Sequence, residues 1–450
     1  MSDPDVRSIA EAVVAAARAA GADAADAIVA ESDGLEIGVR LGEPEKLSRA
    51  RERRMGLRVF AGQSTAIVSS ADLSRAAIDE MAREAYALAR ITEADRHAGL
   101  PDADALAGET PALDLYDPAV TSLEPAPAFE LATRAEAAAL GANDEITNSE
   151  GAEFSGGGGR VAYASSTGFI GSYDSSFFSL GVVPVATRNG QMQRDSWHSA
   201  RRWLDHLDAP EDIGAEAARR ALRRLGAQRV ATGEYPVVFD PQTASSLLRH
   251  LASAISGPAL YRRASFLLDC LGESVASPLV TVVDDPLRPA GPASRPFDDE
   301  GIASRTQTIV EQGVLRSYLL DTYSARRLGL RSTAHASRSI GDAPSVASTN
   351  LHLQPGPETP EAIIASVARG LYVTELIGFG VNLVSGDYSR GASGLWIENG
   401  ELTHAVEEIT IAGNLRTMLA GIDRVGDDLD VQRATSAPTL RVQGLTIASG

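Results

Sequence analysis

A helix predicted over residues 240–255 carries one histidine where a zinc protease would carry a metal-binding pair. Asp240 can cap the first amides of this helix, and apolar residues recur along it at helical spacing. A zinc-protease helix places a second histidine about four or five residues after the first, with a glutamate beside the first as general base for a metal-bound water. Here Leu251 follows His250 directly, and Ile255 occupies the later position. The spacing therefore predicts that this helix lacks a complete zinc site.

The remaining histidines and the single cysteine do not supply the missing ligands by spacing. The other histidines share no metal-like spacing with one another or with His250, although folding can also gather ligands that are distant in sequence. Cys270 lies in an apolar run, which favours a buried small hydrophobic residue over a nucleophile. The other histidines are His97, His198, His206, His335, His352 and His404.

A polar motif between two glycines, at residues 386–391, is the best candidate for contact with a peptide or a partner. The glycines allow another backbone to approach closely. Tyr388 offers a rigid surface with a hydroxyl group, and Arg390 can hold a carboxylate through two hydrogen bonds. Asp387, Tyr388 and Arg390 are therefore the predicted substrate-binding or partner-binding residues. The alternative is an Asp387–Arg390 ion pair that only fixes a turn.

Several longer motifs are similar to those of a known family. The most specific are the segments 253–257 and 380–392. With them, the chain resembles the TldD/PmbA family, and in particular its PmbA branch, also called TldE. The resemblance covers most of the chain. Further matching segments are 148–151, 190–195, 297–301, 319–326 and 408–415.

The resemblance has direct implications for metal binding. In that family the TldD branch carries an HExxxH zinc motif, whereas the PmbA branch lacks it and pairs with TldD to form a cytosolic metalloprotease. On this alignment His250 is a vestigial ligand position, Leu251 replaces the general base and Ile255 replaces the second ligand. The resemblance thus implies no catalytic residue, no metal and no cofactor in this chain, and a zinc ion in a TldD-like partner.

Two functions from different classes remain open at this point. The first is a non-catalytic partner subunit of a TldD-type zinc metalloprotease that cleaves unfolded peptides or peptide precursors. Such a subunit would help to present an extended peptide, for example by adding a strand to a sheet edge. The second is an enzyme in its own right, either a metallohydrolase with ligands outside the motif or a peptide-modifying enzyme. We also expect that the chain can form a homodimer when the partner is missing.

The composition of the chain limits the kinds of partner and the cellular compartment that we expect. The 450 residues carry a formal net charge of -19, which argues against a nucleic-acid partner because such binding depends on basic residues that release counterions. The single cysteine excludes an intramolecular disulfide and fits a reducing compartment. The N-terminal sequence shows neither a signal peptide nor a membrane span. We therefore expect a cytoplasmic protein with no membrane association.

The periodicity predicts an α+β fold with two domains. Residues 1–226 are expected to form a mixed α+β N-terminal domain, and residues 227–450 a strand-rich C-terminal domain. Four consecutive glycines, Gly156 to Gly159, raise the alternative of a phosphate-binding loop, but no lysine follows them and the sequence continues as a strand. A flexible hairpin turn is the favoured interpretation. A final helix is expected over residues 414–425.

Overall fold

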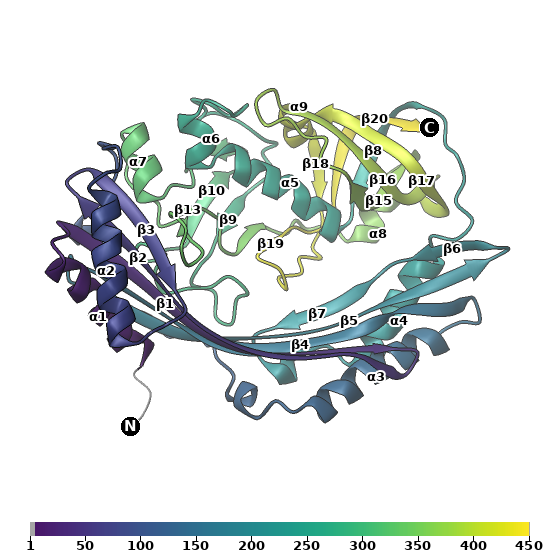
Figure 1. The fold of residues 1–450 in the computed structure, drawn as a ribbon. Helices are drawn as coiled ribbons and strands as arrows, with labels where there is room; N and C mark the ends of the chain where they lie inside the picture. The colour runs from purple at the N-terminus through teal and green to yellow at the C-terminus, as the bar shows by residue number, and fades with distance from the viewer. Residues whose placement is uncertain (1–4, 450) are drawn as a thin grey trace.

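The computed structural model describes residues 5–449, which form an α+β fold (Figure 1). Strands account for 40% of the residues and helices for 24%, so the predicted fold class is confirmed. No helix within the described residues is long and apolar enough to cross a membrane.

The N-terminal sheet has seven antiparallel strands and is strongly curved (Figure 1). Its strands follow the order β3-β2-β1-β4-β5-β6, and β7 pairs with β5 beside β6. Four of these strands have 17 to 20 residues, which is long for a globular protein. The strands are β1 (Ala24–Arg40), β2 (Glu43–Ala61), β3 (Ser64–Ser70), β4 (Ile146–Ser165), β5 (Ile170–Arg188), β6 (Gln191–Arg194) and β7 (Trp197–Arg201).

One face of this sheet is covered by four helices, and the strand periodicity explains why. Alternate residues of a strand face the same side. In β1, Ala27 and Val29 pack in one hydrophobic cluster with α1 and α2, while Leu35 and Ile37 pack in another with α3 and α4. The alternate residues of β1, such as Asp26, lie on the other face of the sheet, which faces the C-terminal half. The helices are α1 (Val6–Ala19), α2 (Arg75–Ala89), α3 (Pro125–Gly141) and α4 (Pro210–Leu222), and the helical turns η1 (Ala103–Ala105), η2 (Pro118–Ser122) and η3 (Leu204–His206) lie between them in the sequence.

The four glycines lie inside β4, so the predicted hairpin turn at this place is wrong. Gly157 pairs with Gly34 of β1 on one side and with Phe177 of β5 on the other. A Cβ atom at Gly157 would lie 2.6 Å from the Asp33 carbonyl oxygen. The glycines are needed because neighbouring backbone approaches too closely for a side chain, which is the other common meaning of glycine in a strand.

The C-terminal half contains a six-stranded sheet in the order β17-β16-β15-β8-β20-β18. Because β17 also pairs with β20, five of these strands form a closed ring. Helix α9 (Leu415–Ala420) ends before residue 425, where the predicted helix 414–425 would end. The last part of the predicted helix forms strand β18 instead. The strands are β8 (Gly233–Phe239), β15 (Arg369–Ile377), β16 (Asp387–Glu398), β17 (Glu401–Asn414), β18 (Ile422–Val425) and β20 (Leu440–Ser449).

A second, five-stranded sheet and several short helices complete this half. The sheet has the order β11-β10-β9-β14-β19, and β12 pairs with β13 separately. The strands of the N-terminal sheet all precede residue 202, and those of the other sheets all follow residue 232. The division at residues 226 and 227 into two domains stays a prediction. The remaining elements are α5 (Pro241–Ala254), α6 (Gly257–Tyr261), β9 (Val282–Asp284), β10 (Gln307–Glu311), β11 (Val314–Leu315), α7 (Thr322–Leu328), β12 (Ala336–Ser337), β13 (Ser345–Val346), β14 (Leu351–Leu353), α8 (Pro360–Ala365) and β19 (Thr435–Ser436).

Candidate functional site

His250 lies on α5 and faces the first residues of strand β16. The helix starts as predicted, with the Asp240 carboxylate accepting a hydrogen bond of 2.8 Å from the Thr243 amide. The His250 ring packs edge to face on Tyr388, with 6.1 Å between the ring centroids. Leu251 and Ile255 are fully buried in the large C-terminal core. The two positions that replace zinc-site residues therefore serve hydrophobic packing.

The surroundings of His250 do not fit a zinc ion. Burial, together with Arg390 and Arg249, lowers the pKa of His250 to about 4, so the ring is neutral at physiological pH. A neutral imidazole can bind metal, but two neighbouring guanidinium groups disfavour a divalent cation, and Leu251 and Ile255 offer no ligand atom. Among residues 5–449, no three His, Cys, Asp or Glu side chains form a group that could hold a metal ion.

The structure brings Tyr388 and Arg390 to His250 and separates Asp387 from them. Tyr388 is buried, whereas Asp387 is exposed, as expected for consecutive residues of β16. The Asp387 carboxylate accepts a hydrogen bond of 2.6 Å from the Ser385 hydroxyl, and Arg390 donates one of 3.1 Å to the Leu376 carbonyl. Asp387 and Arg390 thus lie on opposite faces of the strand and are held by different groups.

Three polar atoms of this cluster are buried without a hydrogen-bond partner among the described residues. They are His250 Nε2, Tyr388 Oη and Arg390 Nε. Burial raises the pKa of Tyr388 to about 12, so its hydroxyl stays protonated and can donate. Each unpaired buried polar group costs about 1–3 kcal/mol. The charge of the neighbouring Arg390 lowers the pKa of His250 and acts in the same direction on Tyr388, although burial dominates at both residues.

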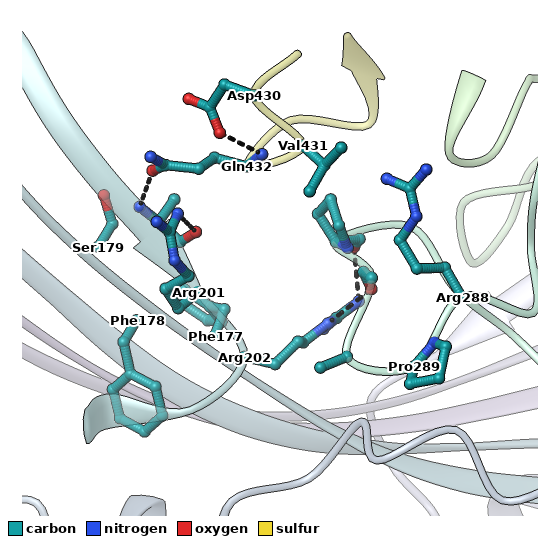
Figure 2. A pocket seen from close by; sticks show the side chains of 14 residues that line it. Phe177, Phe178, Ser179, Arg201, Arg202, Arg288, Pro289, Asp430, Val431 and Gln432 are labelled. Carbon is teal, nitrogen blue, oxygen red and sulfur yellow. Dashed lines mark hydrogen bonds between the residues drawn. The ribbon is translucent and has the colours of Figure 1, made fainter. Parts of the chain in front are cut away.

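A cavity of about 310 Å³ lies elsewhere, between β7 and loops of the C-terminal half (Figure 2). Its walls include Phe177, Pro289 and Val431, so much of its surface is apolar. Arg202 holds one wall in place through a hydrogen bond of 3.2 Å to the Gly291 carbonyl. No sequence motif indicated this cavity, because its residues come from four separate segments of the chain.

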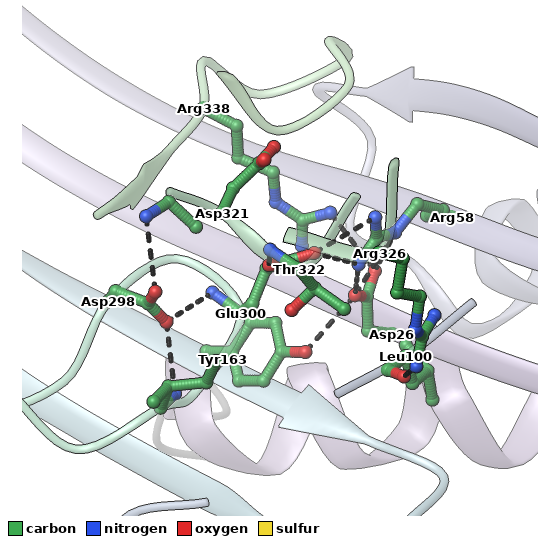
Figure 3. A network of polar contacts seen from close by, with 12 residues as sticks. Asp26, Arg58, Leu100, Tyr163, Asp298, Glu300, Asp321, Thr322, Arg326 and Arg338 are labelled. Carbon is green, nitrogen blue, oxygen red and sulfur yellow. Dashed lines mark hydrogen bonds and ion pairs between the residues drawn. The ribbon is translucent and has the colours of Figure 1, made fainter. Parts of the chain in front are cut away.

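A buried network of charges joins the N-terminal sheet to the C-terminal half (Figure 3). Asp26 on β1 accepts hydrogen bonds from Arg58 on β2 at 3.2 Å and from Arg338 at 3.0 Å. The Tyr163 hydroxyl of β4 donates to the same carboxylate at 3.1 Å. Glu300 lies 3.4 Å from Arg58 and accepts a bond of 2.8 Å from the amide that starts α7. This network fixes the relative position of the two halves.

Burial and neighbouring charges set the pKa of each carboxylate in this network. Burial alone would raise the pKa of Asp26, but Arg338 and Arg58 outweigh burial, and the pKa lies below the ordinary value. Burial raises the pKa of Glu300 despite Arg58. Burial and the neighbouring Glu300 also raise the pKa of Asp298. Asp298 and Glu300 belong to the acidic run 298–300. Both are fully buried and accept hydrogen bonds from backbone amides, for example those of Ile302 and Thr322.

Other titratable residues that the sequence singled out have structural partners. His335 is buried and lies 2.9 Å from Asp284, and Asp284 also accepts a bond of 2.9 Å from the Thr349 amide. Cys270 is buried within the hydrophobic core, which confirms its predicted burial. His352 lies 3.2 Å from Arg288. None of these residues lies in the His250 cluster.

Comparison with known proteins places the whole chain in one family. Sequence profiles of the PmbA/TldA metallopeptidases match residues 25–89 as domain 1, 118–225 as the central domain and 232–449 as the C-terminal domain. The metalloprotease PmbA of Escherichia coli O157:H7 is 38% identical over 431 residues, which cover 95% of this chain and 92% of that protein. A metalloprotease PmbA homologue of Haemophilus influenzae is also 38% identical, with 95% and 92% coverage.

Solved structures agree with the sequence relatives. A Bacteroides thetaiotaomicron protein described as a candidate modulator of DNA gyrase has a TM-score of 0.93, 28% identity and full coverage of both chains. TldE from Thermococcus kodakarensis shares the fold with a TM-score of 0.88, at 21% identity, and covers 98% of this chain and 100% of that one. With three family domains and relatives of the PmbA type along most of its length, the chain belongs to the PmbA/TldD family of metallopeptidases, in its PmbA (TldE) branch.

Proposed function

We propose that this chain is the non-catalytic subunit of a metalloprotease whose zinc is carried by a TldD-like partner. The proposal rests on the surroundings of α5. His250 lies near the guanidinium groups of Arg390 and Arg249. Leu251 and Ile255, which occupy the positions of the base and the second ligand, are buried in the hydrophobic core. A metal-bound water needs three protein ligands and a base nearby, and this helix supplies one imidazole.

The relatives support the existence of a suitable partner. Haemophilus influenzae and Buchnera aphidicola of Acyrthosiphon pisum each have a relative named as a PmbA homologue and another named as a TldD homologue. The TldD homologue of Haemophilus influenzae is 29% identical over 259 residues, which cover 55% of this chain. We propose that the two types of chain form a heterodimer in the cytoplasm and cleave unfolded peptides or peptide precursors.

The predicted contact residues have a defined place in this proposal. Tyr388 and Arg390 offer a hydroxyl donor and a guanidinium donor that fit a backbone carbonyl or a carboxylate. Asp387 is exposed on the other face of β16, where it can meet the partner. The bound zinc would supply the activated water in the partner, while this chain would bind and position the peptide.

The test is reconstitution from separately purified subunits. We expect the isolated chain to contain no stoichiometric zinc and to leave an unfolded peptide intact, and a mixture with the TldD-like chain from the same organism to cleave it. The matched control is a mixture in which the glutamate of the partner's HExxxH motif is replaced by glutamine. Zinc bound tightly to the isolated chain, with cleavage that survives this control, would instead support an enzyme in its own right.

A further inference from the structure

Strand β7 has a free edge that faces the C-terminal half. It pairs with β5 in antiparallel register, for example Ser199 with Leu180, and no other strand of residues 5–449 pairs with it. Free edges present backbone donors and acceptors to which an extended chain can add as a new strand.

Side chains occupy the backbone groups at this edge. The Ala200 amide donates a hydrogen bond of 3.0 Å to Gln432 Oε1, and the Ala200 carbonyl accepts one of 3.1 Å from Arg201 Nη1 (Figure 2). Gln432 belongs to the irregular segment between β18 and β19, and the Asp430 carboxylate holds its amide at 3.1 Å. Gln432 and Arg201 thus satisfy the groups that a neighbouring strand would use, so an added strand must displace these two side chains from Ala200.

Two cavities flank this edge and share Asp430 and Gln432 in their walls. The cavity at the Arg201 end is the largely apolar one described above, with Phe177 half exposed in its wall. The cavity at the Trp197 end has a volume of about 290 Å³ and is lined by several arginines. We call β7 and these two cavities the β7 groove.

Among the described residues, two of the four arginines that line the second cavity, Arg223 and Arg433, form no ion pair with a carboxylate. Arg219 is paired with Glu216 at 2.7 Å, and Arg220 lies 3.4 Å from Asp195. Arg223 has Nε and Nη2 atoms that are buried without a hydrogen-bond partner among the described residues. Burial and the neighbouring Arg220 lower the pKa of Arg223, and the charge of Asp195 opposes them only in part.

The carboxylates that line the same cavity are already engaged. Asp240 caps α5, and Asp430 holds the Gln432 amide. Asp428 accepts hydrogen bonds of 2.9 and 2.7 Å from the amide and hydroxyl of Thr439. These carboxylates keep their charge, so the cavity as a whole is not cationic. The reason to expect an external anionic group at Arg223 is local, because two of its buried nitrogens lack a hydrogen-bond acceptor among the described residues.

We propose that the β7 groove binds an extended peptide segment that adds a strand to β7, with an apolar side chain in the apolar cavity and a carboxylate against Arg223. The identification of this segment as part of the peptide substrate rests on the proposed function; the binding itself does not. Strand β7 joins the two cavities over about three residues, or roughly 10 Å, because a strand rises about 3.3 Å per residue. The preferred ligand therefore carries its apolar and acidic side chains about two to four residues apart. Even spacings put both side chains on one face of the added strand, and a spacing of three puts them on opposite faces.

Binding is measured on the isolated full-length chain. The probe is a fluorescein-labelled peptide of serine and threonine with one phenylalanine and one glutamate, made with spacings of about two, three and four residues so that both faces of the strand are covered. Each spacing is made in both orders because either strand direction can add to an edge. We expect a rise in anisotropy for at least one order, and slower hydrogen exchange of residues 197–201 in the complex. Replacing the glutamate of the probe by glutamine should weaken binding about tenfold, since a hydrogen bond to a charged group contributes about 1.5–3 kcal/mol.

Variants of the chain locate the two contacts. Arg223→Ala should weaken binding of the glutamate probe about tenfold and leave the glutamine probe unchanged. Arg219→Ala is the matched control, because Arg219 lines the same cavity but is already paired, and it should bind both probes like wild type. Ala200→Pro should also weaken binding at least tenfold. It removes the outward amide that bonds Gln432, and proline is tolerated at a sheet edge.

Thermal melting of each variant shows whether it is folded. If Ala200→Pro unfolds, a probe with methylated backbone nitrogens tests the same strand pairing on the wild-type chain and should not bind. Equal affinity for the glutamate and glutamine probes, or protection that excludes residues 197–201, would overturn the inference. Because no TldD-like chain is present, this failure is distinct from a failed reconstitution, which would overturn the proposed function and leave binding at β7 intact.

Discussion

Replacing Asp26 by asparagine should destabilise the protein by about 3–5 kcal/mol, the usual effect of removing one partner of a buried ion pair. Asp26 is fully buried and accepts hydrogen bonds from Arg58, Arg338 and Tyr163. Arg58 would keep Glu300 at 3.4 Å, but among residues 5–449 Arg338 forms no other side-chain ion pair, and its Nε and Nη2 are already unpaired. The variant therefore leaves a buried cation without compensation.

Thermal and urea unfolding, followed by circular dichroism at neutral pH, measure this effect. At about 2.1 cal/mol/K per residue, the entropy of unfolding of a 450-residue chain converts 3–5 kcal/mol into a fall in Tm of roughly 3–5 °C. Glu211→Gln is the matched control, because it breaks an exposed pair with Arg134 and should have a much smaller effect. A change of less than about 1 kcal/mol for Asp26→Asn would refute the idea that the network holds the two halves together.

The pH dependence of the same variant gives an independent check. Arg338 and Arg58 hold the folded-state pKa of Asp26 below its ordinary value, even though burial alone would raise it. Such a carboxylate stabilises the fold fully above its unfolded pKa of about 3.9, and this stabilisation is lost as the pH falls through the lower folded value. The difference between wild type and Asp26→Asn should be constant from about pH 5 to 7 and should shrink below about pH 4.

Three further variants test the local account. His250→Ala should leave zinc content and partner-dependent cleavage nearly unchanged, whereas loss of a true ligand or of its support costs about tenfold or more; metal analysis and the reconstituted assay decide this. Arg390→Ala should reduce peptide cleavage by the reconstituted pair more than Arg390→Lys, with melting of the subunit as control, and equal cleavage by wild type and Arg390→Ala would assign the residue a structural role. Gly157→Val should prevent correct pairing of β4, because its Cβ would lie 2.6 Å from the Asp33 carbonyl oxygen, and a variant that expresses and melts like wild type would contradict this.

Local patterns in the sequence predicted the local structure well. The cap at Asp240 and the apolar spacing after it gave α5 its correct start, and the burial of Leu251 and Ile255 follows from the same pattern. The glycines within β4 were misjudged because glycine is equally typical of turns and of strands where backbone approaches closely. Only the pairing of β4 with β1 and β5, set by distant segments, distinguishes these two meanings.

The candidate sites were harder to predict from the sequence than the local structure. The motif 386–391 drew attention to Tyr388 and Arg390, but their contact with His250 depends on the packing of α5 against β16. Arg58 and Glu300 are 242 residues apart, and no short-range pattern links two such charges. The β7 groove is likewise formed by segments from both halves of the chain. Such sites emerge only when tertiary structure places distant side chains together.

The central claim is that this chain contributes binding and positioning while its partner contributes the zinc. The most direct measurement is the zinc content and peptide-cleaving activity of the isolated chain, of the TldD-like chain from the same organism and of their purified complex. We predict one zinc per complex, located in the TldD-like chain, and cleavage that requires both chains. Stoichiometric zinc in the isolated chain described here, with cleavage in the absence of the partner, would contradict the claim.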